Sequence, residues 1–116
     1  MIQTEDGEIL ADEVEIADGF LEKATGLMLR DRFPEGSALV FDFSRRKRVF
    51  VHMMFVRFPV DVLLLDGKNR VVKKTTLQPW RGVCRGKAAR MIELPEGVCE
   101  QLEEGEKIIF EVDGLE

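Results

Sequence analysis

Histidine and cysteine are scarce in this chain of 116 amino acids, which holds one histidine and two cysteines. Two cysteines do not make a disulfide framework, and a chain of this length can fold on its hydrophobic core alone. A zinc site would need carboxylates or a second copy of the chain to complete four ligands. We therefore expect no disulfide framework, no bound metal and no cofactor.

Long apolar runs are also missing, since no stretch approaches the roughly 18 residues of a membrane span. The first residues carry Glu5, Asp6 and Glu8 where a secretory signal needs positive charge and then an apolar stretch. We expect a cytoplasmic protein that does not associate with membranes.

The common catalytic and nucleotide-binding motifs are absent as well. The sequence has no Walker loop, no G-x-G-x-x-G, no H-E-x-x-H and no G-x-S-x-G. It also shows no helix-turn-helix pattern and no aromatic RNA-binding motif. A function therefore has to be argued from individual residues.

Charge is present in abundance but is unevenly distributed along the chain. The net charge is −5, yet residues 1–22 carry eight carboxylates and no lysine or arginine. Residues 23–92 have a net charge of +11, and residues 93–116 have a net charge of −8. This segmentation says more about partners than the overall charge does.

Alternating apolar residues and turn residues predict one mainly β (α+β) domain over residues 1–116. The clearest hairpin joins strands at 60–65 and 70–77 through Asp66-Gly67-Lys68-Asn69. Two short helices are expected at 18–28 and 95–103. The other predicted strands lie within 8–17, 38–43, 49–56, 88–94 and 107–112, with a basic connection at 45–48 and a long loop at 78–87. Six to eight such strands favour a small β-barrel or a barrel-like sandwich.

His52 and Asp61 are the first candidate functional residues. His52 lies in an apolar strand, where a hydrogen-bonded structural histidine is the simpler interpretation of an imidazole. Asp61 lies inside the apolar run 59–65, where a carboxylate is costly unless it is paired or hydrogen-bonded. It either holds a loop or binds Arg57, or it acts as an acid, base or ligand-orienting group.

The segment 80–87 is the second candidate, because Trp80, Arg81 and Cys84 lie among glycines and basic residues. Nearby cations favour a thiolate, so Cys84 could join His52 and Asp61 in a catalytic set, although a small structural thiol is the simpler interpretation. Trp80 could stack on a base or a sugar. The run Arg45–Arg48 could attract nucleic acid, or it could be a solvated surface that the acidic termini neutralise.

Several runs, taken in order, resemble the DUF192 family of small uncharacterised domains. They are Ala24–Arg30, Ala38–Phe41, His52-Met53, Phe58–Asp66, Pro79-Trp80, Ile92–Gly97 and Gly105-Glu106. The resemblance covers about residues 20–112 and implies a compact, mostly β domain without an assigned activity. Many members have a tryptophan before Met53 and polar residues after it. His52 and the apolar residues 54–56 take those places here, and this resembles the intracellular archaeal branch.

We expect a non-catalytic binding domain for an anionic or polar small ligand, formed by Asp61, Arg57, His52, Trp80 and Arg81. One alternative is a hydrolase- or transferase-like enzyme that uses His52, Asp61 and Cys84. The other is a module that binds nucleic acid or a protein partner through the basic central segment.

Overall fold

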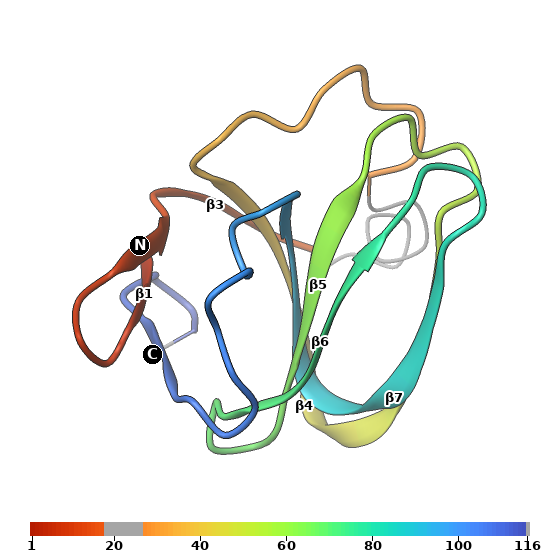
Figure 1. Cartoon of the computed structure of the whole chain (residues 1–116). Coiled ribbons are helices and arrows are strands. Elements are labelled where there is room, and N and C mark those ends of the chain that lie inside the picture. Colours follow the sequence, from red (N-terminus) through yellow and green to blue (C-terminus); the bar gives the residue numbers. More distant parts are fainter. Residues whose placement is uncertain (18–26, 116) are drawn as a thin grey trace.

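The computed structural model describes residues 1–17 and 27–115, and these residues form eight strands in two sheets and no helix. The small sheet has the order β2-β1-β8, and the large sheet has the order β3-β4-β7-β5-β6 (Figure 1). The strands of the small sheet are β1 (Ile2–Thr4), β2 (Ile9–Ala11) and β8 (Ile108–Phe110). Those of the large sheet are β3 (Glu13–Ile16), β4 (Ser37–His52), β5 (Val60–Leu65), β6 (Val71–Leu77) and β7 (Val83–Pro95).

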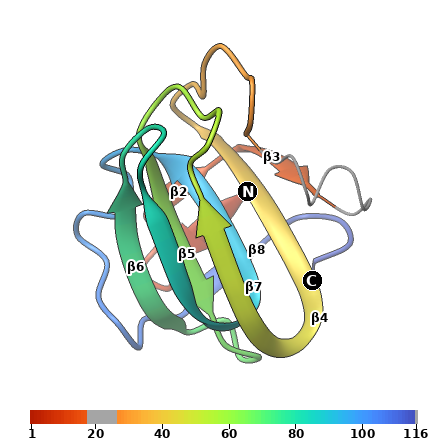
Figure 2. The same cartoon turned by 90° about the vertical axis from the view of Figure 1, so that its right-hand side faces the viewer.

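The long strands β4 and β7 pair with each other along two stretches that a wide bulge separates. Asp42 pairs with Arg90 and Lys47 pairs with Ala88, so residues 43–46 stand opposite a single residue of β7. Ser44 takes a positive φ of 67°, and its backbone N–H donates to Asp42 Oδ1 at 2.9 Å. The ribbon turns back on itself at this bulge, and both views show the turn (Figures 1 and 2).

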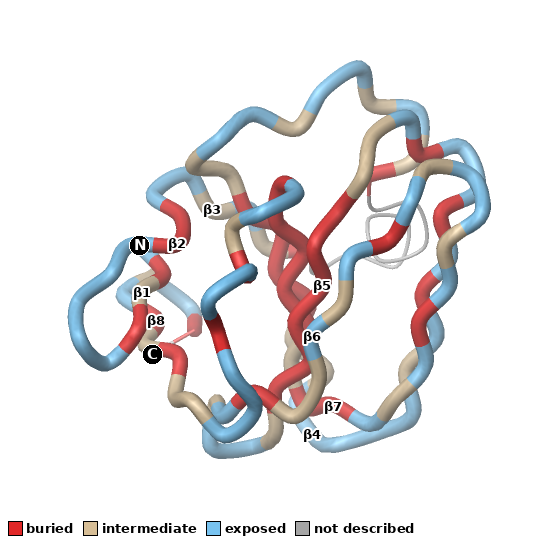
Figure 3. Tube along the Cα trace, in the orientation of Figure 1, coloured by how far each residue is buried: buried red, intermediate tan, exposed pale blue. Residues whose placement is uncertain are grey.

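Two apolar clusters lie on opposite faces of the large sheet, and β5 contributes to both. All six residues of β5 are buried (Figure 3). Leu63 and Leu65 pack toward the small sheet, whereas Val60, Val62 and Leu64 pack toward the folded-back part of β4 and β7. Burial on both faces explains why this strand is almost continuously apolar.

The prediction of a β-rich fold with six to eight strands is confirmed, and so is the hairpin of β5 and β6 around residues 66–69. The barrel is not found. The large sheet ends at β3 and at β6, and the strands of the described residues do not close into a ring. None of these residues forms a helix that is long and apolar enough to cross a membrane.

The predicted helix at 95–103 is wrong, because this segment forms successive turns after the end of β7. Gly97 has a left-handed φ of +95°, and the Asp61 carboxylate accepts hydrogen bonds from the N–H groups of Gly97 and Cys99. A right-handed helix cannot contain that backbone conformation. The other predicted helix, at 18–28, lies outside the described residues except for its last two positions, which belong to a turn.

The predicted basic connection at 45–48 and the second half of the predicted loop at 78–87 are also wrong, since both form strand. Residues 45–48 belong to β4, at its bulge, and residues 83–87 begin β7. Gly86 misled the prediction because it is a packing residue rather than a turn residue. A Cβ atom there would lie 2.6 Å from Leu64 Cδ1, so the absence of a side chain lets the Leu64 side chain pack against the backbone of β7.

Candidate functional site

Glu93 is a buried carboxyl group near the end of β7, the middle strand of the large sheet. It pairs with Leu39 of β4 on one side and with Val62 of β5 on the other. Its side chain is only 6% exposed. Burial raises the pKa of Glu93 from 4.5 to about 7, against the opposing positive charge of Arg30. The group therefore changes its charge near neutral pH.

A hollow of about 270 Å³ lies beside Glu93, along the second half of β4. Nine of its thirteen lining residues are apolar, and the other four are basic or titratable. Among the described residues, the lining comprises Leu27, Met28, Phe41, Phe43, Val49, Phe50, Val51, Val56 and Met91, together with Lys47, Arg48, His52 and Glu93.

Aromatic packing shapes the wall of this hollow. The rings of Phe41 and Phe43 stack with their centroids 6.4 Å apart, and Lys47 Nζ lies 4.8 Å from the centroid of the Phe43 ring. The hollow thus brings aromatic rings, a titratable acid and a cation together within one small volume. The described residues contain no group of three or more histidine, cysteine, aspartate and glutamate side chains that could hold a metal ion.

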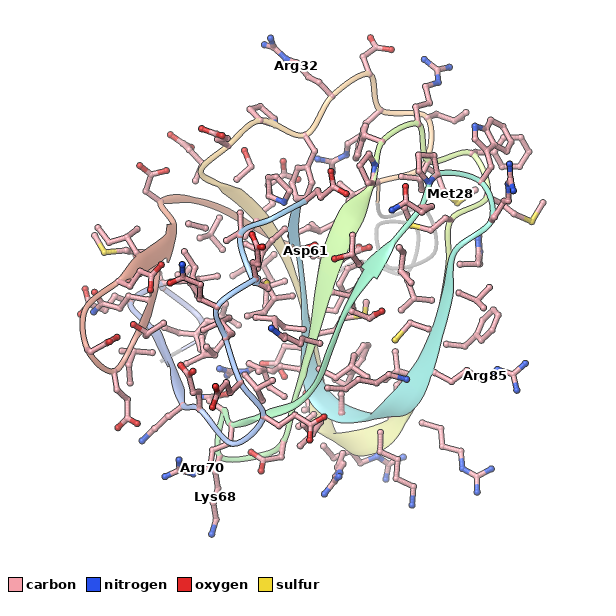
Figure 4. The ribbon with its side chains drawn as sticks, in the orientation of Figure 1. Met28, Arg32, Asp61, Lys68, Arg70 and Arg85 are labelled. Carbon is pink, nitrogen blue, oxygen red and sulfur yellow. The ribbon has the colours of Figure 1, made fainter. Side chains whose placement is uncertain are left out.

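Asp61, the carboxylate that the sequence pointed to, lies on β5 (Figure 4) and does not line the hollow of Glu93. It is 2% exposed and accepts hydrogen bonds from Thr76 Oγ1 at 2.7 Å and from the backbone N–H groups of Gly97 and Cys99, each at 3.0 Å. These bonds hold the turn that follows β7, which is the structural role considered for Asp61 from the sequence. A second hollow, of about 600 Å³, lies over this turn and includes Asp61 in its lining.

The other predicted site residues are exposed and do not gather around Asp61. Arg57 pairs with Asp31 at 2.9 Å. His52 lines the hollow of Glu93, and its Nδ1 accepts the N–H of Met54 at 3.3 Å. Trp80 and Arg81 lie in the loop before β7 and line neither hollow. Of the five residues, the structure thus brings only His52 to the hollow of Glu93 and only Asp61 to the second hollow.

Cys84 and His52 lie on opposite faces of the ribbon. Cys84 pairs with Val51, both side chains belong to the apolar cluster, and His52 is exposed on the other side. Burial raises the pKa of the Cys84 thiol, with Lys73 opposing the effect. Burial, with a contribution from Asp61, also raises the pKa of the Cys99 thiol, to about 12. Both cysteines are therefore neutral thiols inside the protein.

Glu93 was missed in the reading of the sequence, although a signal was present. It lies in the apolar run Met91-Ile92-Glu93-Leu94, where a charged side chain is as unexpected as Asp61 is in its own strand. A buried carboxylate is costly in either strand unless it is paired or hydrogen-bonded.

Comparisons with known proteins support the resemblance to the DUF192 family that the sequence motifs indicate. The model of the DUF192 family, described as an uncharacterized ACR, matches residues 1–110. The chain is 42% identical to a UPF0127 protein of Pyrococcus abyssi over 101 residues, which cover 83% of this chain and 84% of that protein. It is 40% identical to a UPF0127 protein of Pyrococcus horikoshii over 102 residues, which cover 83% of this chain and 85% of that one.

The fold is similar to that of solved bacterial structures. One is a protein of unknown function from Novosphingobium aromaticivorans, with a TM-score of 0.79 and 18% identity over 94% of this chain and 81% of that one. Another comes from Sinorhizobium meliloti 1021, with a TM-score of 0.77 and 21% identity over 93% of this chain and 88% of that one. The family match and the archaeal relatives together show that the chain belongs to the DUF192 (UPF0127) family.

Proposed function

We propose that the hollow beside Glu93 binds a small ligand that combines an apolar body with an anionic or polar group. The observation that carries the proposal is Glu93 itself, a buried acid with a pKa of about 7 that lines the hollow. Titratable groups with strongly shifted pKa values in a concave site are typical of functional sites.

The size of the hollow and the nature of its walls favour a small and partly apolar ligand. Its volume of about 270 Å³ is just below the range of roughly 300–1,000 Å³ that is typical of small-molecule sites. Phe41, Phe43 and Met91 would contact the apolar body of such a ligand.

Charge favours an anionic group on this ligand. Lys47 lines the hollow and would attract an anion. Below pH 7, Glu93 is mostly protonated, so it no longer repels an anion and can donate a hydrogen bond to it. Above pH 7, its negative charge would oppose binding. We expect an anionic ligand to bind more tightly as the pH falls.

Naphthalene-1-sulfonate is a suitable probe, because its sulfonate stays charged over the whole pH range of the experiment. Binding would be followed by backbone amide NMR shifts at residues 41–43 and 91–93. If only the protein with protonated Glu93 binds the probe, a pKa of about 7 makes affinity about tenfold higher at pH 6 than at pH 8.

Glu93→Gln keeps the shape of the side chain and should bind the probe tightly at both pH values. The matched control is Glu104→Gln, which changes an exposed glutamate in the same way and should keep the pH dependence of the parent protein. An equal affinity at pH 6 and pH 8, or an unchanged pH dependence in Glu93→Gln, would refute the proposal. So would amide shifts that avoid residues 41–43 and 91–93.

A further inference from the structure

The outer face of the folded-back ribbon carries cations and rings that no feature of the fold requires. Residues 47–52 of β4 pair with residues 83–88 of β7, and alternate side chains point away from the apolar cluster. The outward pairs are Arg48 with Lys87, Phe50 with Arg85, and His52 with Val83. All six residues are exposed, and Phe50 and Val83 are 56% and 58% exposed.

This outer face is positively charged and has no carboxylate of its own. Arg48, Arg85 and Lys87 supply three positive charges, and the Arg85 guanidinium lies 5.5 Å from the centroid of the Phe50 ring. The ion pairs between described residues use other arginines, at positions 30, 57 and 90. Three cations beside exposed rings on one flat strand surface are suited to an anionic partner that also has planar groups.

At the end of the ribbon, two aromatic side chains extend the face in a strained conformation. Phe55 and Trp80 have positive φ angles of 63° and 68°, and their ring centroids are 5.1 Å apart in an edge-to-face arrangement. The two side chains are 41% and 53% exposed.

Backbone hydrogen bonds fix the loops that carry these rings. The N–H of Trp80 donates to Met53 O at 3.0 Å, and the N–H of Leu29 donates to Phe55 O at 2.8 Å. Non-glycine residues in the left-handed region are strained, and glycine would remove the strain. Bulky rings kept in such positions and turned toward solvent indicate a contact surface.

We propose that this surface, the outer face of 48–52 and 83–87 with Phe55 and Trp80, binds single-stranded nucleic acid. The three cations would contact phosphates, and the rings of Phe50, Trp80 and Phe55 would stack on bases. Phe50 and His52 are alternate residues of β4 with ring centroids 6.4 Å apart, and sheet-based RNA-binding surfaces stack two or three bases on aromatic rings.

Charge argues against a second copy of the chain as the occupant. A two-fold interface places the same patch on both partners, so the three cations would face their own copies. An anionic membrane would attract the cations and contact the apolar end of the ribbon, but its headgroups have no planar groups to stack on the ring of Phe50, which lies within the strand beside Arg85. A nucleic acid uses both the rings and the cations, and it is therefore the occupant that these contacts fit.

The surface shares Arg48 with the basic run at 45–48 that the sequence pointed to, but it does not include Arg45 and Arg46. Arg45 and Arg46 lie at the bulge of β4, at the other end of the ribbon from Trp80, beside Asp42 and Asp66. A backbone hydrogen bond from Arg70 lowers the pKa of Asp66, and the charge of Arg46 contributes to the same effect. The cations of this run are thus partly balanced by neighbouring carboxylates.

The chain contains a single tryptophan, so Trp80 fluorescence reports on this surface alone. Fluorescein-labelled rU12 and dT12 would be titrated with the full chain at 20–300 mM salt, and anisotropy would give affinity. We expect binding at low salt, quenching of Trp80, and a slope of log affinity against log salt of about −2 for three phosphate contacts.

Arg85→Glu should weaken binding at least tenfold and reduce the salt slope. Its matched control is Lys68→Glu, which makes an equal change of charge at the turn between β5 and β6, away from Arg85 (Figure 4). Phe50→Ala should weaken binding about tenfold through lost stacking, whereas Ile9→Ala, at an equally exposed apolar residue of the small sheet, should leave it unchanged.

The proposal is overturned if neither oligonucleotide binds at 20 mM salt, or if Arg85→Glu and Lys68→Glu weaken binding equally. Binding to phosphatidylglycerol vesicles with a blue shift of Trp80, without oligonucleotide binding, would overturn it in favour of a membrane. Phe50 also lines the hollow of Glu93, but Arg85 and Lys68 do not, and the readouts differ. The comparison of Arg85→Glu with Lys68→Glu can therefore fail while the ligand proposal stands, and the reverse also holds.

Discussion

Asp61 and Glu93 are both buried carboxyl groups in the large sheet, yet their surroundings are opposite. Asp61 is 2% exposed and accepts three hydrogen bonds, two of them from backbone N–H groups. Glu93 is 6% exposed and lines a hollow, where desolvation dominates and raises its pKa to about 7. Burial alone therefore does not mark a functional acid. The two groups differ in whether hydrogen bonds that hold the fold together already occupy the carboxylate.

The largest effect should come from Asp61→Ala. The substitution leaves the N–H groups of Gly97 and Cys99 and the Thr76 hydroxyl without their acceptor, and we expect a loss of about 4 kcal/mol in the free energy of unfolding. Urea unfolding followed by circular dichroism measures it. Thr76→Val, which removes one of the three donors, should lose only about 1 kcal/mol. A loss below 1 kcal/mol for Asp61→Ala would contradict the conclusion that the hydrogen bonds to Asp61 stabilise the fold.

Glu93→Gln should raise the free energy of unfolding near neutral pH, whereas Asp61→Ala should lower it. Because folding raises the pKa of Glu93 from 4.5 to about 7, the folded state holds an extra proton between these values, and stability falls as the pH rises through them. The penalty, about 3 kcal/mol, is absent below pH 4.5 and complete above pH 7. Urea unfolding at pH 4 and pH 8 should show the variant more stable than the parent at pH 8 and nearly equal at pH 4. A variant less stable at pH 8 would contradict the assignment.

The two cysteines sharpen the comparison, because burial should make both thiols unreactive toward alkylation. Their raised pKa values keep them protonated near neutral pH, so alkylation by iodoacetamide at pH 7.5 should be far slower in the folded protein than in urea. Mass spectrometry of the modified peptides separates Cys84 from Cys99. Rapid alkylation of Cys84 that is lost in His52→Ala would instead support the enzyme that uses His52, Asp61 and Cys84.

The smallest effect is expected for the exposed pair of Arg57 and Asp31. Their side chains are 52% and 90% exposed, so Arg57→Ala should change the free energy of unfolding by at most about 0.5 kcal/mol. Thermal unfolding at low and high salt gives this value. A loss of more than 2 kcal/mol would show that Arg57 has a buried role that the ion pair does not account for.

The local pattern of apolar and turn residues was sufficient to predict the strands along which all residues are similarly buried. The run 60–65 is apolar because both of its faces are buried, and the Asp-Gly turn after it defines the hairpin. The burial of Asp61 followed from the same run. Pattern failed where tertiary contacts decide the conformation. Gly86 permits close packing rather than a turn, and Asp61 holds the turn at 97–99 where a helix was predicted.

The grouping of the site residues could not be predicted, because it depends on the bulge in β4. The fold-back at residues 43–46 carries Lys47 and His52 over the large sheet and brings them to the hollow of Glu93, which is far from them in the sequence. No local sequence pattern indicates how far a two-stranded ribbon bends. Arg57, Trp80 and Arg81 stay predicted ligand residues, and the nucleic-acid surface gives Trp80 a separate role.

The titration of Glu93 tests the central claim most directly. The side-chain carboxyl carbons of the glutamates can be followed by 13C NMR from pH 3 to pH 9, with Glu93→Gln identifying the resonance of Glu93. We predict a midpoint near pH 7 for Glu93, set apart from the exposed glutamates. A midpoint below pH 5 would contradict the account, because the hollow would then hold an ordinary ionised carboxylate.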